Sequence, residues 1–143
     1  MRSRRTLAII LAAGLLGSGS AFAAAAQLPA EHHQGGVAFL TGGIGKDEAK
    51  AFESAEKRFP LALEFVDRVG KRDEFLAGTR VEVKDPHGKT VLSTVADGPF
   101  LLARLPSGRY AVAATYDSKT MTRHVVVDGK AGHPIVFEWK AKA

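Results

Sequence analysis

Five histidines are the side chains in this sequence best suited to bind a metal ion or to transfer protons near neutral pH. None lies in an HExxH motif or at zinc-finger spacing, and the sequence has no cysteine to complete a mixed site. We therefore expect exposed histidines and no metal site. The alternative is a periplasmic metal-handling protein or a hydrolase that uses these scattered histidines. They are His32, His33, His87, His124 and His133.

A glycine-rich stretch, Gly42–Gly45, precedes a predicted helix, whose N-terminus could bind a phosphate. A P-loop needs serine or threonine where Asp47 stands, and a dinucleotide fingerprint needs a third glycine where Glu48 stands. Both carboxylates would also repel a phosphate. We expect a structural turn in which Gly43 and Gly45 let a strand and a helix pack closely, and no bound cofactor.

Catalytic groups of other kinds are not indicated either. No serine lies in a G-x-S-x-G elbow, and the adjacent acids Asp47/Glu48 and Asp73/Glu74 point apart in a helix or a loop. The lack of cysteine excludes a thiol nucleophile. We therefore expect no catalytic residues and no enzymatic activity.

Tyr116 and Trp139 are the candidates for a binding surface, because both stand near the ends of predicted strands beside polar turns. Aromatic rings in such places can hold glycans or peptides. The alternative is that both rings fill the core, as most aromatic side chains do. The edge strands of a sheet offer a second route, in which a partner adds a strand of its own.

The first 23 residues have the three parts of a secretory signal peptide. Arginines at positions 2, 4 and 5 precede an apolar core over residues 7–16, and Ala21-Phe22-Ala23 forms an A-x-A cleavage site. The apolar core is shorter than the roughly 20 residues that a membrane-spanning helix needs. We expect a protein that is cleaved after Ala23, has no membrane span, and resides in the periplasm or is secreted. The segment Ser3–Leu7 partly matches a twin-arginine signal, so general and twin-arginine export are both open.

Cleavage also changes the charge of the protein. Three of the 20 lysines and arginines lie in the signal and all 15 acids lie after it, which leaves 17 basic residues and an excess of +2. Acids are interleaved with these basic residues. A surface that follows a phosphate backbone needs a concentrated positive patch, so we expect no nucleic-acid binding.

The N-terminal part of the exported chain is expected to form a flexible leader and a β-α-β unit. Residues 24–36 have no apolar periodicity, which predicts the leader. Residues 37–69 predict a strand over Val37–Leu40, an amphipathic helix that ends before Pro60, and a strand from residue 61 in which apolar residues alternate. The charged residues 68–77 are expected to form a connection.

Residues 77–140 are typical of an antiparallel β-sandwich. Short runs of β-forming residues follow one another at intervals of eight to twelve residues, and each run has one apolar face. Turn residues separate the runs, among them Gly98 and Gly108, and we expect a positive φ at Gly108. The fold class is therefore α+β. The predicted strands cover residues 79–84, 90–96, 100–105, 109–116, 120–128 and 134–140.

Four motifs in this part occur in a characteristic order: Val81-Glu82-Val83, Gly88-Lys89, Asp97-Gly98-Pro99-Phe100, and Leu105-Pro106-Ser107-Gly108-Arg109-Tyr110. Over residues 77–128 the sequence resembles the carboxypeptidase regulatory-like domain. The resemblance implies a transthyretin-like (prealbumin-like) sandwich. It also implies that the motif residues are architectural and that the chain is similar to small exported bacterial proteins without an assigned activity.

The transthyretin fold includes one enzyme class, the hydroxyisourate hydrolases, which end in Tyr-Arg-Gly-Ser. This sequence has Glu138–Ala143 in that place, so we do not expect that activity. The resemblance instead implies a non-catalytic accessory or interaction module of the cell envelope. Its partner would be an envelope protein or a glycan.

Overall fold

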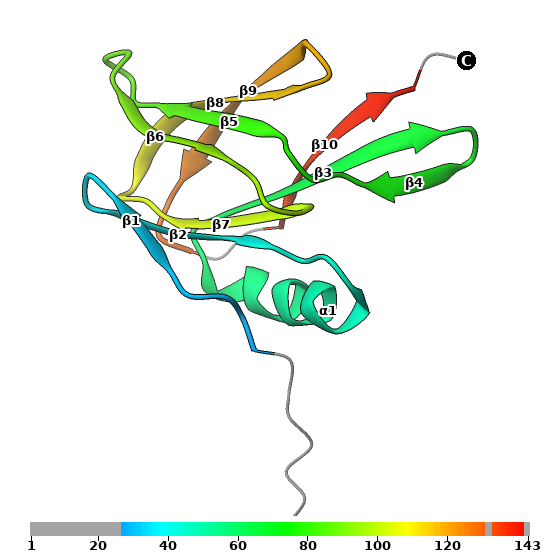
Figure 1. Ribbon diagram of the computed structural model, residues 1–143. Coiled ribbons are helices and arrows are strands. Elements are labelled where there is room, and N and C mark those ends of the chain that lie inside the picture. Colours follow the sequence, from blue (N-terminus) through cyan, green and yellow to red (C-terminus); the bar gives the residue numbers. More distant parts are fainter. Residues whose placement is uncertain (1–26, 131–132, 142–143) are drawn as a thin grey trace, which may run out of the picture.

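The computed structural model of the protein describes residues 27–130 and 133–141. The predicted signal peptide, residues 1–23, lies outside the described residues. Within them, two β-sheets face each other and one helix covers the outer face of the first sheet (Figure 1). The chain is therefore a mostly-β sandwich of two sheets, which the alternating apolar strands predict.

Sheet A has the strand order β1-β2-β7-β3-β10, and β4 pairs with β3 outside this path. Its pairs are antiparallel except that β10 runs parallel to β3. The prediction of a wholly antiparallel sandwich is wrong for β10. This strand follows a strand of the other sheet, so no hairpin turn sets its direction. The strands are β1 (His32–Gln34), β2 (Val37–Gly42), β3 (Leu61–Val69), β4 (Arg72–Phe75), β7 (Phe100–Arg104) and β10 (Ile135–Lys140).

Sheet B is antiparallel throughout and has the order β6-β5-β8-β9. Its longest pair is the hairpin of β8 and β9, in which Gly108 lies opposite Val127 and Tyr116 lies opposite Lys119. The strands are β5 (Arg80–Lys84), β6 (Thr90–Val95), β8 (Gly108–Tyr116) and β9 (Lys119–Val127).

The N-terminal strand-helix-strand segment does not form a separate unit. Strands β2 and β3 each pair antiparallel with β7, so they run parallel to each other with β7 between them. Helix α1 (Lys46–Ala55) and the short helix η1 (Glu56–Arg58) connect them across the outer face of sheet A. The domain boundary predicted between residues 69 and 77 therefore does not divide the fold, because sheet A takes strands from both sides of it.

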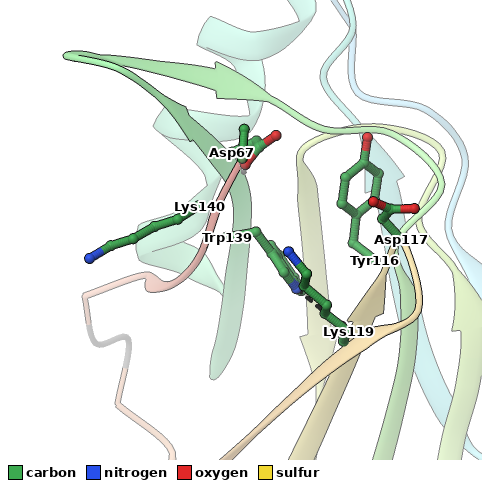
Figure 2. A pocket seen from close by; sticks show the side chains of 7 residues that line it. Asp67, Tyr116, Asp117, Lys119, Trp139 and Lys140 are labelled. Carbon is green, nitrogen blue, oxygen red and sulfur yellow. Dashed lines mark hydrogen bonds between the residues drawn. The ribbon is translucent and has the colours of Figure 1, made fainter. Parts of the chain in front are cut away.

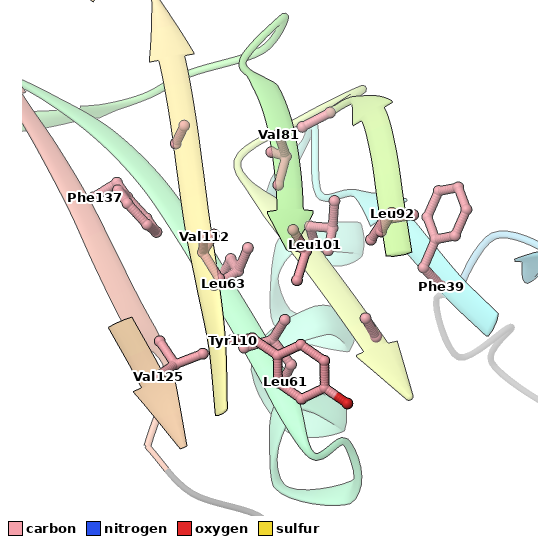
Figure 3. Packing of buried hydrophobic residues seen from close by; sticks show 14 of the residues in the cluster. Phe39, Leu61, Leu63, Val81, Leu92, Leu101, Tyr110, Val112, Val125 and Phe137 are labelled. Atoms are coloured by element: carbon pink, nitrogen blue, oxygen red, sulfur yellow. The ribbon is translucent and has the colours of Figure 1, made fainter. Parts of the chain in front are cut away.

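The central strands of sheet A are buried on both faces. In β7, Leu101 contributes to the cluster between the sheets, whereas Phe100 and Leu102 belong to the cluster under the helix. Successive side chains of a strand point to opposite faces, so one strand serves both clusters. The main core between the sheets includes Phe39, Leu61, Leu63, Val81, Leu92, Leu101, Tyr110, Val112, Val125 and Phe137 (Figure 3).

Part of the segment predicted as a flexible leader is ordered as β1. Its last residue, Gln34, joins the two sheets at one side of the sandwich. The Gln34 side-chain amide donates to the Ser93 carbonyl at 3.1 Å, and the Ser93 backbone N–H donates to Gln34 Oε1 at 2.6 Å. The amide thus satisfies one donor and one acceptor of β6, an edge strand whose outer side would otherwise be open.

The predicted connection over residues 68–77 contains β4, which forms a hairpin with a lengthened β3. Gly70 has a φ of 64° and makes the tight turn. All four residues of β4 are exposed, so the strand has no apolar face that could mark it in the sequence.

Gly108 does not have the positive φ that its turn motif predicts. It is the first residue of β8, and a Cβ atom there would lie 3.6 Å from the Tyr110 ring, an ordinary contact. The connection between β7 and β8 is held instead by the Tyr110 hydroxyl, which donates to the Pro106 carbonyl at 2.7 Å. Gly98 cannot be replaced easily by another residue, because a Cβ there would overlap the backbone of Gly42.

Candidate functional site

A pocket of about 440 Å³ lies at the end of the sandwich where the β8–β9 turn approaches the last residues of β3 and β10 (Figure 2). It brings together Tyr116 and Trp139, which the sequence indicated as a possible binding surface, from opposite sheets. Binding by these two residues stays a prediction. We call this site the Trp139 pocket, and its lining residues are Asp67, Tyr116, Asp117, Lys119, Trp139, Lys140 and Ala141.

The turn between β8 and β9 sets one wall of the Trp139 pocket. Asp117 and Ser118 have φ values of 47° and 61°, both in the left-handed region, between the paired residues Tyr116 and Lys119. Two successive positive φ values are typical of the type I′ turn of a two-residue hairpin, and aspartate tolerates this conformation better than most residues. The tight turn therefore fixes where the side chains of Asp117 and Lys119 begin.

Trp139 is mainly a core residue, with 4% of its surface exposed. Its ring lies 6.2 Å from that of Phe137 and 6.4 Å from that of Phe65, and its indole N–H donates to the Lys119 carbonyl at 3.1 Å. Tyr116 meets Trp139 edge to face at 5.9 Å and is only half-buried. Tyr116 is thus the ring that a ligand can reach, and the buried ring of Trp139 packs against the Tyr116 ring.

Asp67 contributes a buried acceptor that has no donor. Its Oδ1 atom is shielded from solvent and forms no hydrogen bond among the described residues. The strand register places Asp67 of β3 opposite Trp139 of β10, and Figure 2 shows the two side chains as neighbours in the lining of the pocket. The neighbouring Arg68 is paired elsewhere, with Asp73 at 2.8 Å and Glu138 at 3.3 Å. The Asp67 side chain as a whole is half-buried and lines the pocket, so an outside donor can approach its carboxylate from the pocket side.

The charges around the Trp139 pocket balance formally. Asp67 and Asp117 carry negative charge, and Lys119 and Lys140 carry positive charge. Lys140 extends away from the other labelled side chains, whereas Lys119 lies beside Trp139 (Figure 2). The pocket therefore offers hydrogen-bond acceptors and donors without a strong field of either sign.

The glycine-rich loop is occupied by a carboxylate of the chain itself. The backbone N–H of Gly43 donates to Glu48 Oε1 at 2.8 Å, at the helix end where a phosphate would have to bind. Gly43 has a φ of 97°, and a Cβ there would collide with the ring of Phe100. This geometry explains the glycine by close packing between the loop and β7.

The five histidines are exposed and, apart from the adjacent His32 and His33, belong to different segments of the fold. His32 and His33 are in β1, His124 is in β9, and His87 and His133 are in connections. In the part of the chain that the structure describes, no three histidine, aspartate or glutamate side chains are grouped so that they could hold a metal ion. None of the helices in residues 27–130 and 133–141 is long and apolar enough to cross a membrane.

Sequence reasoning found the two aromatic residues of the Trp139 pocket and missed its charged ones. Asp67 is the residue that a closer reading could have found, since an aspartate directly after the buried Phe65-Val66 pair is unusual in a strand. The fold and the site define a two-sheet β-sandwich with a helix on one face and a small polar pocket at one end. No protein-family model and no curated protein match the sequence.

Proposed function

We propose that the protein is an exported, non-catalytic binding module of the cell envelope, and that it holds a neutral glycan in the Trp139 pocket. The observation that carries the proposal is that the half-buried Asp67 and the half-exposed ring of Tyr116 line the same pocket. A sugar hydroxyl would donate to the Asp67 carboxylate, and the apolar face of the sugar ring would pack on the tyrosine.

The balance of charges favours a neutral ligand over an ion. A cation would meet Lys119 and Lys140, and an anion would meet Asp67 and Asp117. A polyhydroxyl compound both donates and accepts hydrogen bonds, so it can use the carboxylates and the ammonium groups together.

The proposed location in the cell envelope rests on the N-terminal sequence. The proposed family assignment rests on the four motifs between Val81 and Tyr110. Residues 1–23 have the charged, apolar and A-x-A segments of a signal peptide. A carboxypeptidase regulatory-like domain with a transthyretin-like sandwich is the finer assignment that we propose. It is supported by the two-sheet architecture and by the hydrogen bond from Tyr110 to the Pro106 carbonyl within the Leu105–Tyr110 motif.

Intrinsic fluorescence tests the proposal directly, because Trp139 is the one tryptophan of the sequence and lines the pocket. We would titrate the protein with neutral hexasaccharides of glucose and of N-acetylglucosamine. We expect a saturable change with at least one of them, and a loss of affinity of about tenfold in Asp67→Asn and in Tyr116→Ala. Asp47→Asn, on the exposed first turn of α1, is the matched control. The absence of a saturable change with every sugar up to about 10 mM would refute glycan binding.

A further inference from the structure

A second hollow, of about 520 Å³, lies on the outer face of sheet B at the opposite end of β8 from the Trp139 pocket. Strands β5, β8 and β9 form its floor, and the turn between β5 and β6 forms one side. Arg109 and Tyr116 are seven residues apart along β8, which places the two hollows roughly 20 Å from each other. The two sites are therefore separate.

Three basic side chains surround the second hollow, which we call the cationic hollow. The strand register places Lys84 opposite Ala111 and Ala111 opposite His124, so the lysine and the histidine flank a methyl group on the same face. Arg109 precedes Ala111 by two residues and therefore points to that face too. The small side chain of Ala111 leaves the space between the three basic groups open.

Arg109 and His124 are free to bind a ligand. Both are exposed, and neither forms an ion pair with any described residue. Lys84 is less available, because its Nζ lies 3.4 Å from Glu82 Oε1. We therefore regard Arg109 as the anchor of the site and His124 as its second donor.

The acids near the cationic hollow are engaged in local contacts. Asp85 accepts the backbone N–H groups of His87 and Lys89 through Oδ1, at 2.9 and 3.0 Å, and so closes the β5–β6 turn. Glu82 accepts the Thr90 hydroxyl at 3.0 Å in addition to its contact with Lys84. With these contacts in place, Arg109 and His124 meet no direct carboxylate partner.

We propose that the cationic hollow binds a doubly charged oxyanion, a sulfate or phosphate group, through Arg109 and His124. The planar guanidinium of arginine matches two oxygens of such a group, and an imidazole N–H adds a second donor. The exposed Val126, with 73% of its surface open to solvent, lies opposite Arg109 and supplies an apolar rim. Where the oxyanion is part of a larger molecule, an apolar part of that molecule would pack against Val126.

Inorganic sulfate is the first probe, because its charge does not change between pH 6 and pH 8. We would titrate the protein with sodium sulfate at constant ionic strength and follow backbone amide NMR shifts. Saturable shifts confined to residues around Ala111 are expected, with about tenfold weaker binding in Arg109→Gln. Inorganic phosphate should give the same pattern of shifts.

Two further variants distinguish specific binding in the cationic hollow from nonspecific attraction of sulfate to the positive charges of the protein. Arg80→Gln is the matched control, because Arg80 is on the same face of β5 but lies opposite Thr115, at the far end of the sheet. It should bind sulfate as the unaltered protein does. His124→Gln should also weaken sulfate binding, because it removes the imidazole N–H donor on the β9 side of Ala111. Glu82 and Lys84 on β5, Arg109 on β8 and Asp85 in the turn are the other charged groups on this face near His124.

Three results would overturn the proposal. One is a response to sulfate that does not saturate, and another is a set of shifts that spreads over the whole surface. The third is an equal loss of affinity in Arg80→Gln and Arg109→Gln. Because the Trp139 pocket lies at the other end of β8, none of these results bears on glycan binding.

Discussion

Replacing Glu56 by glutamine is expected to stabilise the protein at pH 8 and to leave its stability nearly unchanged at pH 4.5. Glu56 is in η1, which lies on the outer face of sheet A. Only 8% of the surface of Glu56 is exposed. Its Oε1 has no hydrogen-bond partner among the described residues. Burial, and then the negative charges of Glu64 and Glu53, raise the pKa of Glu56 from 4.5 to about 7.

The sign of the effect follows from the two pKa values. Below pH 4.5 the carboxyl group is protonated in both the folded and the unfolded chain, so its contribution to stability is fully present. Between pH 4.5 and about 7 the unfolded chain loses the proton while the folded chain keeps it, and stability falls as the pH rises. Above about pH 7 the loss is complete and amounts to roughly 3 kcal/mol. Glutamine resembles the protonated acid at every pH, so the variant avoids this loss.

Urea unfolding at pH 4.5 and pH 8 measures the difference. We expect the two proteins to agree within about 1 kcal/mol at pH 4.5 and the variant to be more stable by about 2–3 kcal/mol at pH 8. Glu74→Gln, on the exposed strand β4, is the control and should change stability by less than about 0.5 kcal/mol at both pH values. An equal difference between Glu56→Gln and the unaltered protein at both pH values would show that the pKa of Glu56 is the same in the folded and unfolded states, which would refute the raised pKa.

Three further predictions concern the turns, and urea unfolding tests all of them. Gly98→Ala should lower the free energy of unfolding by about 1–3 kcal/mol, since the new Cβ would overlap the backbone of Gly42. Gly108→Ala should change it by less than about 1 kcal/mol, and a larger loss would mean that Gly108 has the left-handed backbone its motif suggests. Tyr110→Phe should lower the free energy of unfolding by about 1 kcal/mol by removing the hydrogen bond to the Pro106 carbonyl, and an unchanged value would refute a stabilising role for that bond.

Most of the sandwich could be predicted because its strands have one apolar face. Val81 and Val83 alternate with polar residues in β5 and point into the core, as the period of two requires. β1 and β4 could not be found in this way. His32–Gln34 and Arg72–Phe75 are exposed along their whole length and are held by backbone pairing with a neighbouring strand.

The grouping of the segments into one sheet also could not be predicted from periodicity. Phe100 and Leu101 are both fully buried, which indicates a strand covered on two faces but does not say by what. The pairing of β7 with both β2 and β3 depends on contacts between residues 35 or more positions apart. For the same reason the sequence indicated Tyr116 and Trp139 separately, without showing that they would line one pocket together with Asp67.

The raised pKa of Glu56 does not weigh against a binding role, although such shifts often mark catalytic groups. A general base needs a substrate within hydrogen-bond reach, and Glu56 lines neither the Trp139 pocket nor the cationic hollow. The charged groups that contribute to its shift are Glu53 and Glu64, which are acids like itself. The shift therefore follows from placing a carboxyl group where the helix packs on sheet A. The two proposed sites are built instead from side chains suited to hold a ligand: a carboxylate beside an aromatic ring in the Trp139 pocket, and an arginine and a histidine without an ion pair to any described residue in the cationic hollow.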